Sequence, residues 1–95
     1  NASHFGGTPI DYTTAEWAPD ARGALAQLDA AYAGWVDGVR GLSEAQLAEP
    51  VGPAEGPYAS LAYAALVLHI NREAIHHLAE VALLRDLYRA ARPMR

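Results

Sequence analysis

Histidine and glutamate side chains recur at helical spacing in the last third of this chain. His69, Glu73 and His77 are each four residues apart, and Glu80 follows one turn later. Because residues three and four apart are neighbours on a helix surface, these side chains can converge on one point. Imidazole and carboxylate groups are ligands that zinc and nickel accept in proteins. The spacing predicts a divalent-metal site with Glu73 and His77 as ligands and His69 as a candidate third.

Simpler interpretations of the same residues remain open. A glutamate and a histidine four residues apart also form an ordinary ion pair or hydrogen bond on a helix. Glu80 either hydrogen-bonds a ligand histidine or pairs with Arg72 or Arg85. His76 points about 100° away from His77 on a helix, which favours a packing or surface role. The remaining histidine, His4, is a weak candidate ligand because it stands beside a Gly-Gly turn.

Composition restricts the functions that the chain can have. The 95 residues carry a formal net charge of −4, with seven arginines and no lysine. Nucleic-acid binding needs a basic face, so this balance argues against it. Cysteine is absent, which excludes disulfides, thiolate ligands and a cysteine nucleophile. We find no apolar run of membrane-spanning length and no signal-peptide pattern, so we expect no membrane partner and a cytoplasmic protein.

A long first helix is predicted over residues 19–40. Its apolar residues recur at alternating steps of three and four, which is the seam of a left-handed helical bundle; they are Leu25, Leu28, Tyr32, Trp35, Val39 and Leu42. Gly34 and Gly38 weaken a helix intrinsically. We expect them to permit the close approach of a neighbouring helix instead.

The rest of the chain is predicted to form a short helix, a loop and a long last helix. Ser43 and Gln46 have the spacing of a capping box, which opens a short helix that Pro50 ends. Residues 49–58 contain three prolines and two glycines and form a loop. The last helix runs over residues 60–91, and its apolar residues cover most of the circumference, which predicts that much of it is buried. The fold is therefore all-α, with residues 1–95 in a single domain.

The last helix resembles that of a known superfamily. The segment from His69 to Glu80, followed by Leu-Leu-Arg-Asp-Leu-Tyr, is similar to the last helix of the DinB-like superfamily. This superfamily includes YfiT-like metal-dependent hydrolases and mycothiol-dependent maleylpyruvate isomerases. Glu73-x-x-x-His77 matches the family's E-x-x-x-H metal motif, and His69 matches a histidine often found one turn earlier. The resemblance is specific over residues 66–89.

The resemblance implies a fold, a cofactor and a class of reaction. It implies a four-helix bundle of which this chain is the C-terminal portion, without the first two helices and with the third metal ligand upstream of Asn1. It further implies a zinc or nickel ion and a thiol-dependent transferase or isomerase, acting on a small-molecule substrate with a low-molecular-weight thiol such as mycothiol or bacillithiol. The alternative is a non-catalytic helical bundle that serves as an interaction or dimerisation module. In either case, a homodimer could supply the helix surface that this chain lacks.

Overall fold

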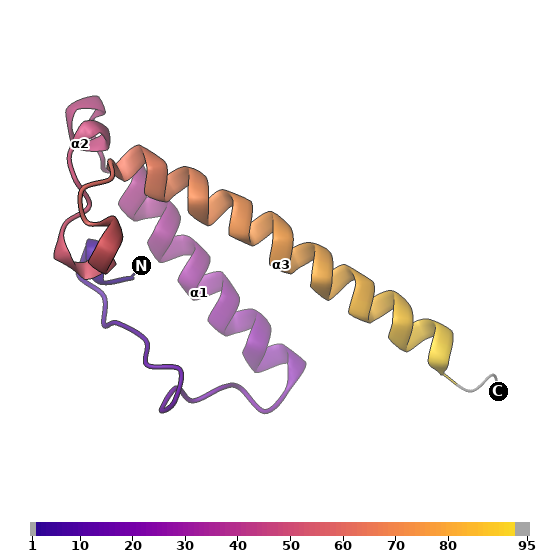
Figure 1. Ribbon diagram of the computed structural model, residues 1–95. Coiled ribbons are helices and arrows are strands. Elements are labelled where there is room, and N and C mark those ends of the chain that lie inside the picture. Colours follow the sequence, from indigo (N-terminus) through magenta and orange to yellow (C-terminus); the bar gives the residue numbers. More distant parts are fainter. Residues whose placement is uncertain (1, 93–95) are drawn as a thin grey trace.

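A computed structural model describes residues 2–92 of the chain, and it is helical (Figure 1). Two long helices, α1 (Ala21–Arg40) and α3 (Tyr63–Ala91), are joined through the short helix α2 (Glu44–Ala48). Two 3₁₀ helices, η1 (Ala2–Phe5) and η2 (Pro53–Tyr58), complete the elements. Over the described residues there is no β-strand, only an isolated bridge between Pro50 and Ala62. The predicted all-α fold class is confirmed.

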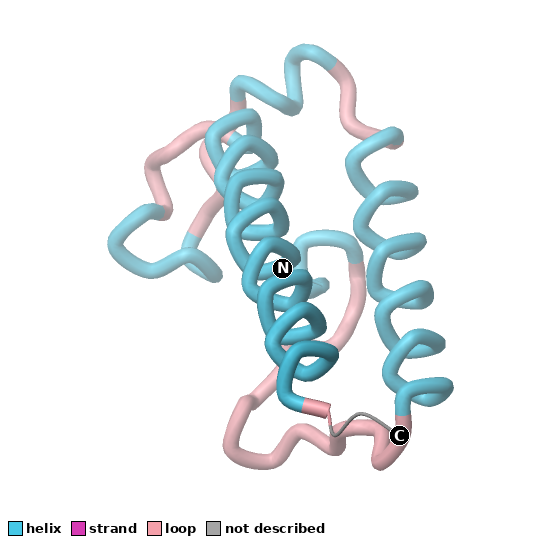
Figure 2. The backbone as a smooth tube through the Cα atoms, turned by 90° about the vertical axis from the view of Figure 1, so that its right-hand side faces the viewer, coloured by secondary structure: helices cyan, strands magenta, loops and turns pink. Residues whose placement is uncertain are grey.

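The two long helices run alongside each other in opposite directions (Figures 1 and 2). α1 begins where the N-terminal segment ends, at Asp20, whose carboxylate accepts a hydrogen bond from the Gly23 amide at 2.7 Å. This N-cap satisfies one of the free amides of the first turn, so the helix starts two residues later than the pattern predicts. The side chain of Gln27 ties the preceding segment to α1 through the amide of Ala18 and the carbonyl of Glu16.

The capping box that the sequence predicts at α2 is present. The amide of Gln46 donates to Ser43 Oγ at 3.1 Å, and the amide of Ser43 donates to Gln46 Oε1 at 2.8 Å. These reciprocal bonds satisfy free amides at the start of a five-residue helix, which is too short to be stable through its own backbone bonds.

The start of α3 is fixed by backbone bonds to the segment after α2. The amide of Val51 donates to the carbonyl of Leu61 at 2.8 Å, and the amide of Tyr63 donates to the carbonyl of Glu49 at 3.0 Å. Ala62 is therefore extended, and α3 begins at Tyr63 rather than at residue 60. The predicted loop 49–58 contains η2, which is kinked at Gly56, where φ is +55°.

Packing is confined to one end of the molecule. Among the described residues, the buried hydrophobic side chains are Val51 and Leu66 alone. The prediction that much of the last helix is buried is wrong: α3 buries only Leu66, and the first-helix seam leaves Leu25 and Tyr32 exposed. The reason is that few side chains of the chain lie against these faces. The radius of gyration is 16.8 Å, against about 12 Å for a compact domain of this length.

The 3₁₀ helix η1 packs on the second half of α1. The ring of Phe5 contacts Trp35 edge to face, with 5.5 Å between ring centroids. The same ring lies so close to the Cα of Gly38 that a methyl group there would overlap it. Gly38 thus permits a close approach, as predicted, and the neighbour is Phe5 of the short 3₁₀ helix η1. Gly34 has no atom within 4 Å of its missing Cβ.

Candidate metal centre on α3

Glu73, His77 and Glu80 lie along one side of α3, and His77 contacts both carboxylates. His77 Nε2 is 3.3 Å from Glu73 Oε2, and His77 Nδ1 is 3.0 Å from Glu80 Oε1. Each nitrogen of this imidazole therefore faces a carboxylate. A neutral imidazole has one N–H, so it donates to one of these carboxylates and leaves its other nitrogen as an acceptor or metal ligand.

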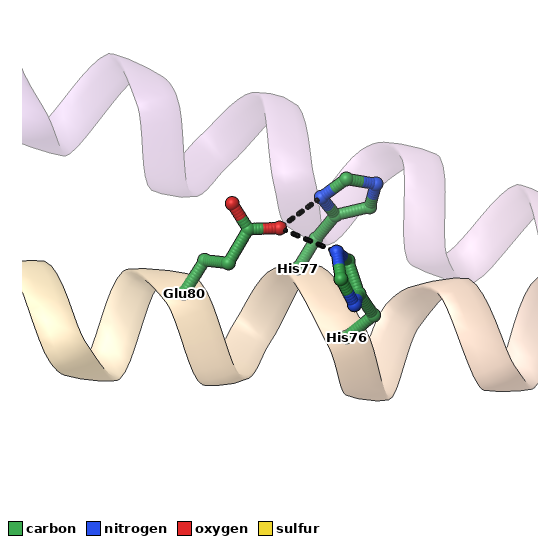
Figure 3. Close-up of side chains that lie close together, drawn as sticks. All are labelled: His76, His77 and Glu80. Atoms are coloured by element: carbon green, nitrogen blue, oxygen red, sulfur yellow. Dashed lines mark hydrogen bonds and ion pairs between the residues drawn. The ribbon is translucent and has the colours of Figure 1, made fainter.

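His76 joins the same cluster (Figure 3). Its Nε2 is 2.9 Å from Glu80 Oε1, the oxygen that also faces His77. The two imidazole rings meet edge to face, with centroids 5.0 Å apart. One donor atom from each of His76, His77 and Glu80 lies within 4.8 Å of the other two, and all three residues are exposed. We call these three residues the α3 triad.

The sequence pattern predicts Glu73 as a member of the site but not His76, because His76 and His77 project from different sides of the helix. His76 and His77 diverge by about 100° at their Cα atoms, yet Glu80 stands four residues after one and three after the other. Its long side chain can therefore reach both rings. His76 can be predicted as a member of the cluster because two histidines precede the same glutamate by four and three residues. The spacing between the two histidines does not predict it.

His69 lies apart from the α3 triad. Its Nδ1 is 3.3 Å from a guanidinium nitrogen of Arg72, three residues later on α3. The donor atoms of His69, Glu73 and His77 do not form a mutually close group of the kind that the triad forms. The structure thus brings Glu73 and His77 together and leaves His69 with Arg72, and the three-ligand set remains a prediction.

Among the described residues, Glu80 contacts histidines and not an arginine, whereas the ligand role of those histidines stays a prediction. Its carboxylate contacts His76 and His77. No ion pair between Glu80 and an arginine is found in the described part of the chain. The arrangement is that of a carboxylate that orients an imidazole through a hydrogen bond.

His4 is the histidine with a buried side chain, only 3% exposed. Its Nε2 is 2.7 Å from Glu55 Oε1, and its Nδ1 is 3.4 Å from the hydroxyl of Tyr63. Both ring nitrogens are therefore engaged, which leaves none free for a metal. His4 instead joins η1 to η2 and to the first residue of α3.

A cavity of about 630 Å³ lies beside the first turns of α3. Its walls include the apolar side chains of Val51 and Leu66, and its polar lining includes Glu55, His69 and Arg72. The volume lies in the range of small-molecule sites, which are mostly apolar with a few convergent polar groups. The loop 49–58 borders this cavity, and His69 on its wall is one helical turn before Glu73.

A lowered carboxyl pKa is found at Asp11, outside this region. The hydroxyl and the amide of Thr13 both donate to the Asp11 carboxylate, at 2.7 and 2.9 Å, and these bonds lower the pKa of Asp11. Asp11 belongs to the exposed segment before α1, so it affects a local turn and not the candidate metal centre.

The fold and the His/Glu cluster define a helical protein with a group of side chains able to hold a metal. A sequence profile of the DinB superfamily matches residues 2–81, and the chain belongs to that superfamily. The match includes every candidate ligand on α3 and ends before the segment 84–89. Neither a curated protein nor a solved structure matches the chain.

Two further predictions concern membrane-spanning helices and the part of the fold expected before Asn1. Within residues 2–92, no helix combines the length and the apolar character that crossing a membrane requires. The prediction that two helices and a third ligand precede Asn1 concerns residues outside this sequence, and it stays a prediction.

Proposed function

We propose that this DinB superfamily protein binds a divalent metal, zinc or nickel, on α3 and catalyses a thiol-dependent transfer or isomerisation. The observation that carries the proposal is the contact of both His77 ring nitrogens with carboxylates, beside the second imidazole of His76. In a tetrahedral zinc site, ligand atoms lie about 3.3 Å apart. In the α3 triad, Glu80 Oε1 lies 2.9 Å from His76 Nε2 and 3.0 Å from His77 Nδ1, and the three donor atoms lie within 4.8 Å of one another, which supports such a site.

We consider two ligand sets, the one predicted from the sequence and the α3 triad, and His77 belongs to both. The first set uses His77 Nε2 with Glu73 and His69; the second uses His77 Nδ1 with His76 and Glu80. Because one imidazole offers a given metal a single nitrogen, the sets exclude each other at a single ion. In the first set Glu80 accepts the Nδ1–H of His77, and in the second Glu73 accepts its Nε2–H. Each carboxylate is thus either a ligand or the group that fixes the ring.

The chain's own residues also supply a place for the reactants. When bound, the metal would act as a Lewis acid and lower the pKa of a water or thiol that it holds. Since the chain has no cysteine, the nucleophilic thiol comes from a separate molecule. The 630 Å³ cavity beside His69 can hold the apolar part of a substrate, and Arg72 on its wall can bind an anionic group.

Metal content measured by mass spectrometry after incubation with zinc or nickel tests the site. We expect close to one metal ion per chain and its loss in His77→Ala, which removes a ligand from both sets. His69→Ala and Glu73→Ala lower the occupancy if the first set is used, whereas His76→Ala and Glu80→Ala lower it if the second is used. Each variant must keep its helical circular dichroism.

Asp86→Ala is the matched control, because it removes an exposed α3 carboxylate outside both sets. Wild-type protein without metal, or occupancy unchanged in His77→Ala, would contradict the metal proposal. The reaction is tested by the metal-dependent consumption of mycothiol, bacillithiol or glutathione in the presence of an electrophile. A protein without cysteine gives no background in an assay that counts free thiols.

The second candidate function is a non-catalytic helical bundle that serves as an interaction module. The exposure of large apolar residues on both long helices favours it. In that case the α3 cluster is a set of exposed ion pairs, each worth about 0.2–1 kcal/mol, and its substitution changes neither metal content nor fold.

A further inference from the structure

The cavity beside the first turns of α3 is lined by side chains of opposite charge. Glu55 and Arg72 both belong to its wall. Among the ion pairs found within residues 2–92, none joins these two groups, so neither charge neutralises the other. The rest of the wall is mainly apolar and aromatic, and it includes Val51, Tyr58, Leu61, Ala65 and Leu66.

Glu55 is held in the cavity wall by a buried histidine. His4, whose side chain is only 3% exposed, has its Nε2 2.7 Å from Glu55 Oε1. A carboxylate only accepts hydrogen bonds, so Nε2 carries the proton, and in a neutral ring Nδ1 then accepts from the Tyr63 hydroxyl at 3.4 Å. With His4 neutral, Glu55 keeps its negative charge. The bond to His4 occupies Oε1, so Oε2 can accept a hydrogen bond from a ligand.

Arg72 is oriented by its neighbour on the same wall. One guanidinium nitrogen lies 3.3 Å from His69 Nδ1, and because a guanidinium has no acceptor, it is the donor in this contact. The bond uses one of five N–H groups. The others can bind a carboxylate, which a guanidinium grips through two parallel hydrogen bonds.

The cavity is built by one short part of the chain, because its walls come from residues 51–72. The amides of Val51 and Gly52 donate to the carbonyls of Leu61 and Ala59 at 2.8 and 3.0 Å. These backbone bonds tie the segment that carries Glu55 to the start of α3. The two charges therefore belong to the packed end of the molecule.

We propose that this cavity binds a small zwitterion with an apolar body, which is either an amino acid with a large apolar side chain or a short apolar peptide. Arg72 binds the carboxylate, Glu55 binds the ammonium group, and the apolar wall covers the body between them. An apolar anion would leave Glu55 without a partner, and an apolar amine would do the same to Arg72. This inference rests on the proposed function only in taking the ligand to be a substrate, because binding itself needs no metal.

Isothermal titration calorimetry at neutral pH tests the proposal, with a chelator present so that metal binding plays no part. Phenylalanine and leucyl-leucine represent the two sources of the zwitterion. Each is compared with its N-acetyl form, which lacks the cationic amine, and with its C-terminal amide form, which lacks the carboxylate. We expect saturable binding of at least one zwitterion. Its two capped forms should bind at least about tenfold more weakly, because each loses a hydrogen bond between charged groups.

Substitutions in the wall assign the two ends of the ligand. Arg72→Gln should weaken binding of the zwitterion at least about tenfold but should not weaken binding of the amide form. Glu55→Gln should have the same effect on the zwitterion but should not weaken binding of the N-acetyl form, and its amide oxygen still accepts from His4. Arg85→Gln and Glu44→Gln are the matched controls, because they remove the same charges outside this cavity. Each variant must keep its helical circular dichroism.

Three results would overturn the proposal: neither zwitterion binds, the capped forms bind as tightly as the zwitterion, or Arg72→Gln and Glu55→Gln bind the zwitterion as the natural chain does. Because the titration is done without metal, none of these results bears on the metal site of α3. Conversely, a chain that holds no metal can still bind the zwitterion. A preference for phenylalanine or for leucyl-leucine identifies which of the two sources the spacing of the charges fits.

Discussion

Gly34 and Gly38 stand one helical turn apart on α1, and the structure predicts opposite effects when each becomes alanine. Alanine is favoured over glycine inside a helix by about 1 kcal/mol. A Cβ at Gly34 meets no atom within 4 Å, so Gly34→Ala should gain that full amount. A Cβ at Gly38 would overlap the ring of Phe5. Displacing a packed side chain in this way costs about 1–3 kcal/mol, which cancels or outweighs the helix gain.

The two variants should therefore differ by about 1–3 kcal/mol in their free energy of unfolding, with Gly34→Ala the more stable. Urea denaturation followed by circular dichroism at 222 nm measures this difference, and the two variants serve as controls for each other. The variant Phe5→Ala supplies a second check. With the ring removed, Gly38→Ala should stabilise the protein as Gly34→Ala does, so the two substitutions are coupled.

The reasoning fails if Gly38→Ala raises the stability of the natural sequence as much as Gly34→Ala does. That result would mean that Phe5 does not pack on α1, and that η1 is not held against the helix. A coupling energy near zero between Phe5→Ala and Gly38→Ala would lead to the same conclusion.

Three other contacts give predictions of their own. Ser43→Ala removes the N-cap of α2 and should cost about 1 kcal/mol in urea denaturation; an unchanged midpoint would show that α2 does not contribute to stability. The pKa of Asp11, followed by NMR titration, should lie below its ordinary value and should rise in Thr13→Ala. Since a depressed carboxyl pKa stabilises the folded turn above the unfolded pKa, this contribution is lost as the pH falls through the folded value. His4→Ala deprives Glu55 of its partner and should lower the free energy of unfolding by about 1–3 kcal/mol in urea denaturation. An unchanged free energy of unfolding would mean that this pair does not join η1 to η2.

The helices could be predicted from the sequence because their signals are local. The three- and four-residue steps of α1 and the Ser43 capping box depend only on nearby residues, and both elements are present. The residue at which α3 begins is harder to predict from local sequence. Ala62 is held extended by the bridge to Pro50, which lies twelve residues earlier.

Burial could not be predicted from periodicity. A pattern of apolar residues shows which side chains share a face of a helix, but not whether any surface lies against that face. Leu25 and Ile75 fit such patterns and are both exposed. Spacing alone also predicts only some of the residues in the candidate metal centre. Glu73 and His77 follow from spacing, whereas the inclusion of His76 depends on the reach of the Glu80 side chain.

α3 is held by tertiary contacts at its first turns only, so its second half should open more easily. Its first turn is held by the Tyr63 amide and the buried Leu66, whereas residues 74–92 are all exposed. Local opening should therefore be easier toward the C-terminus, and in a monomer, amide hydrogen exchange should be faster for residues 81–90 than for residues 67–72. His76, His77 and Glu80 lie at the start of the less protected part. A ligand that joins these side chains also closes a helical turn, so its apparent affinity falls with the fraction of chains in which that turn is open.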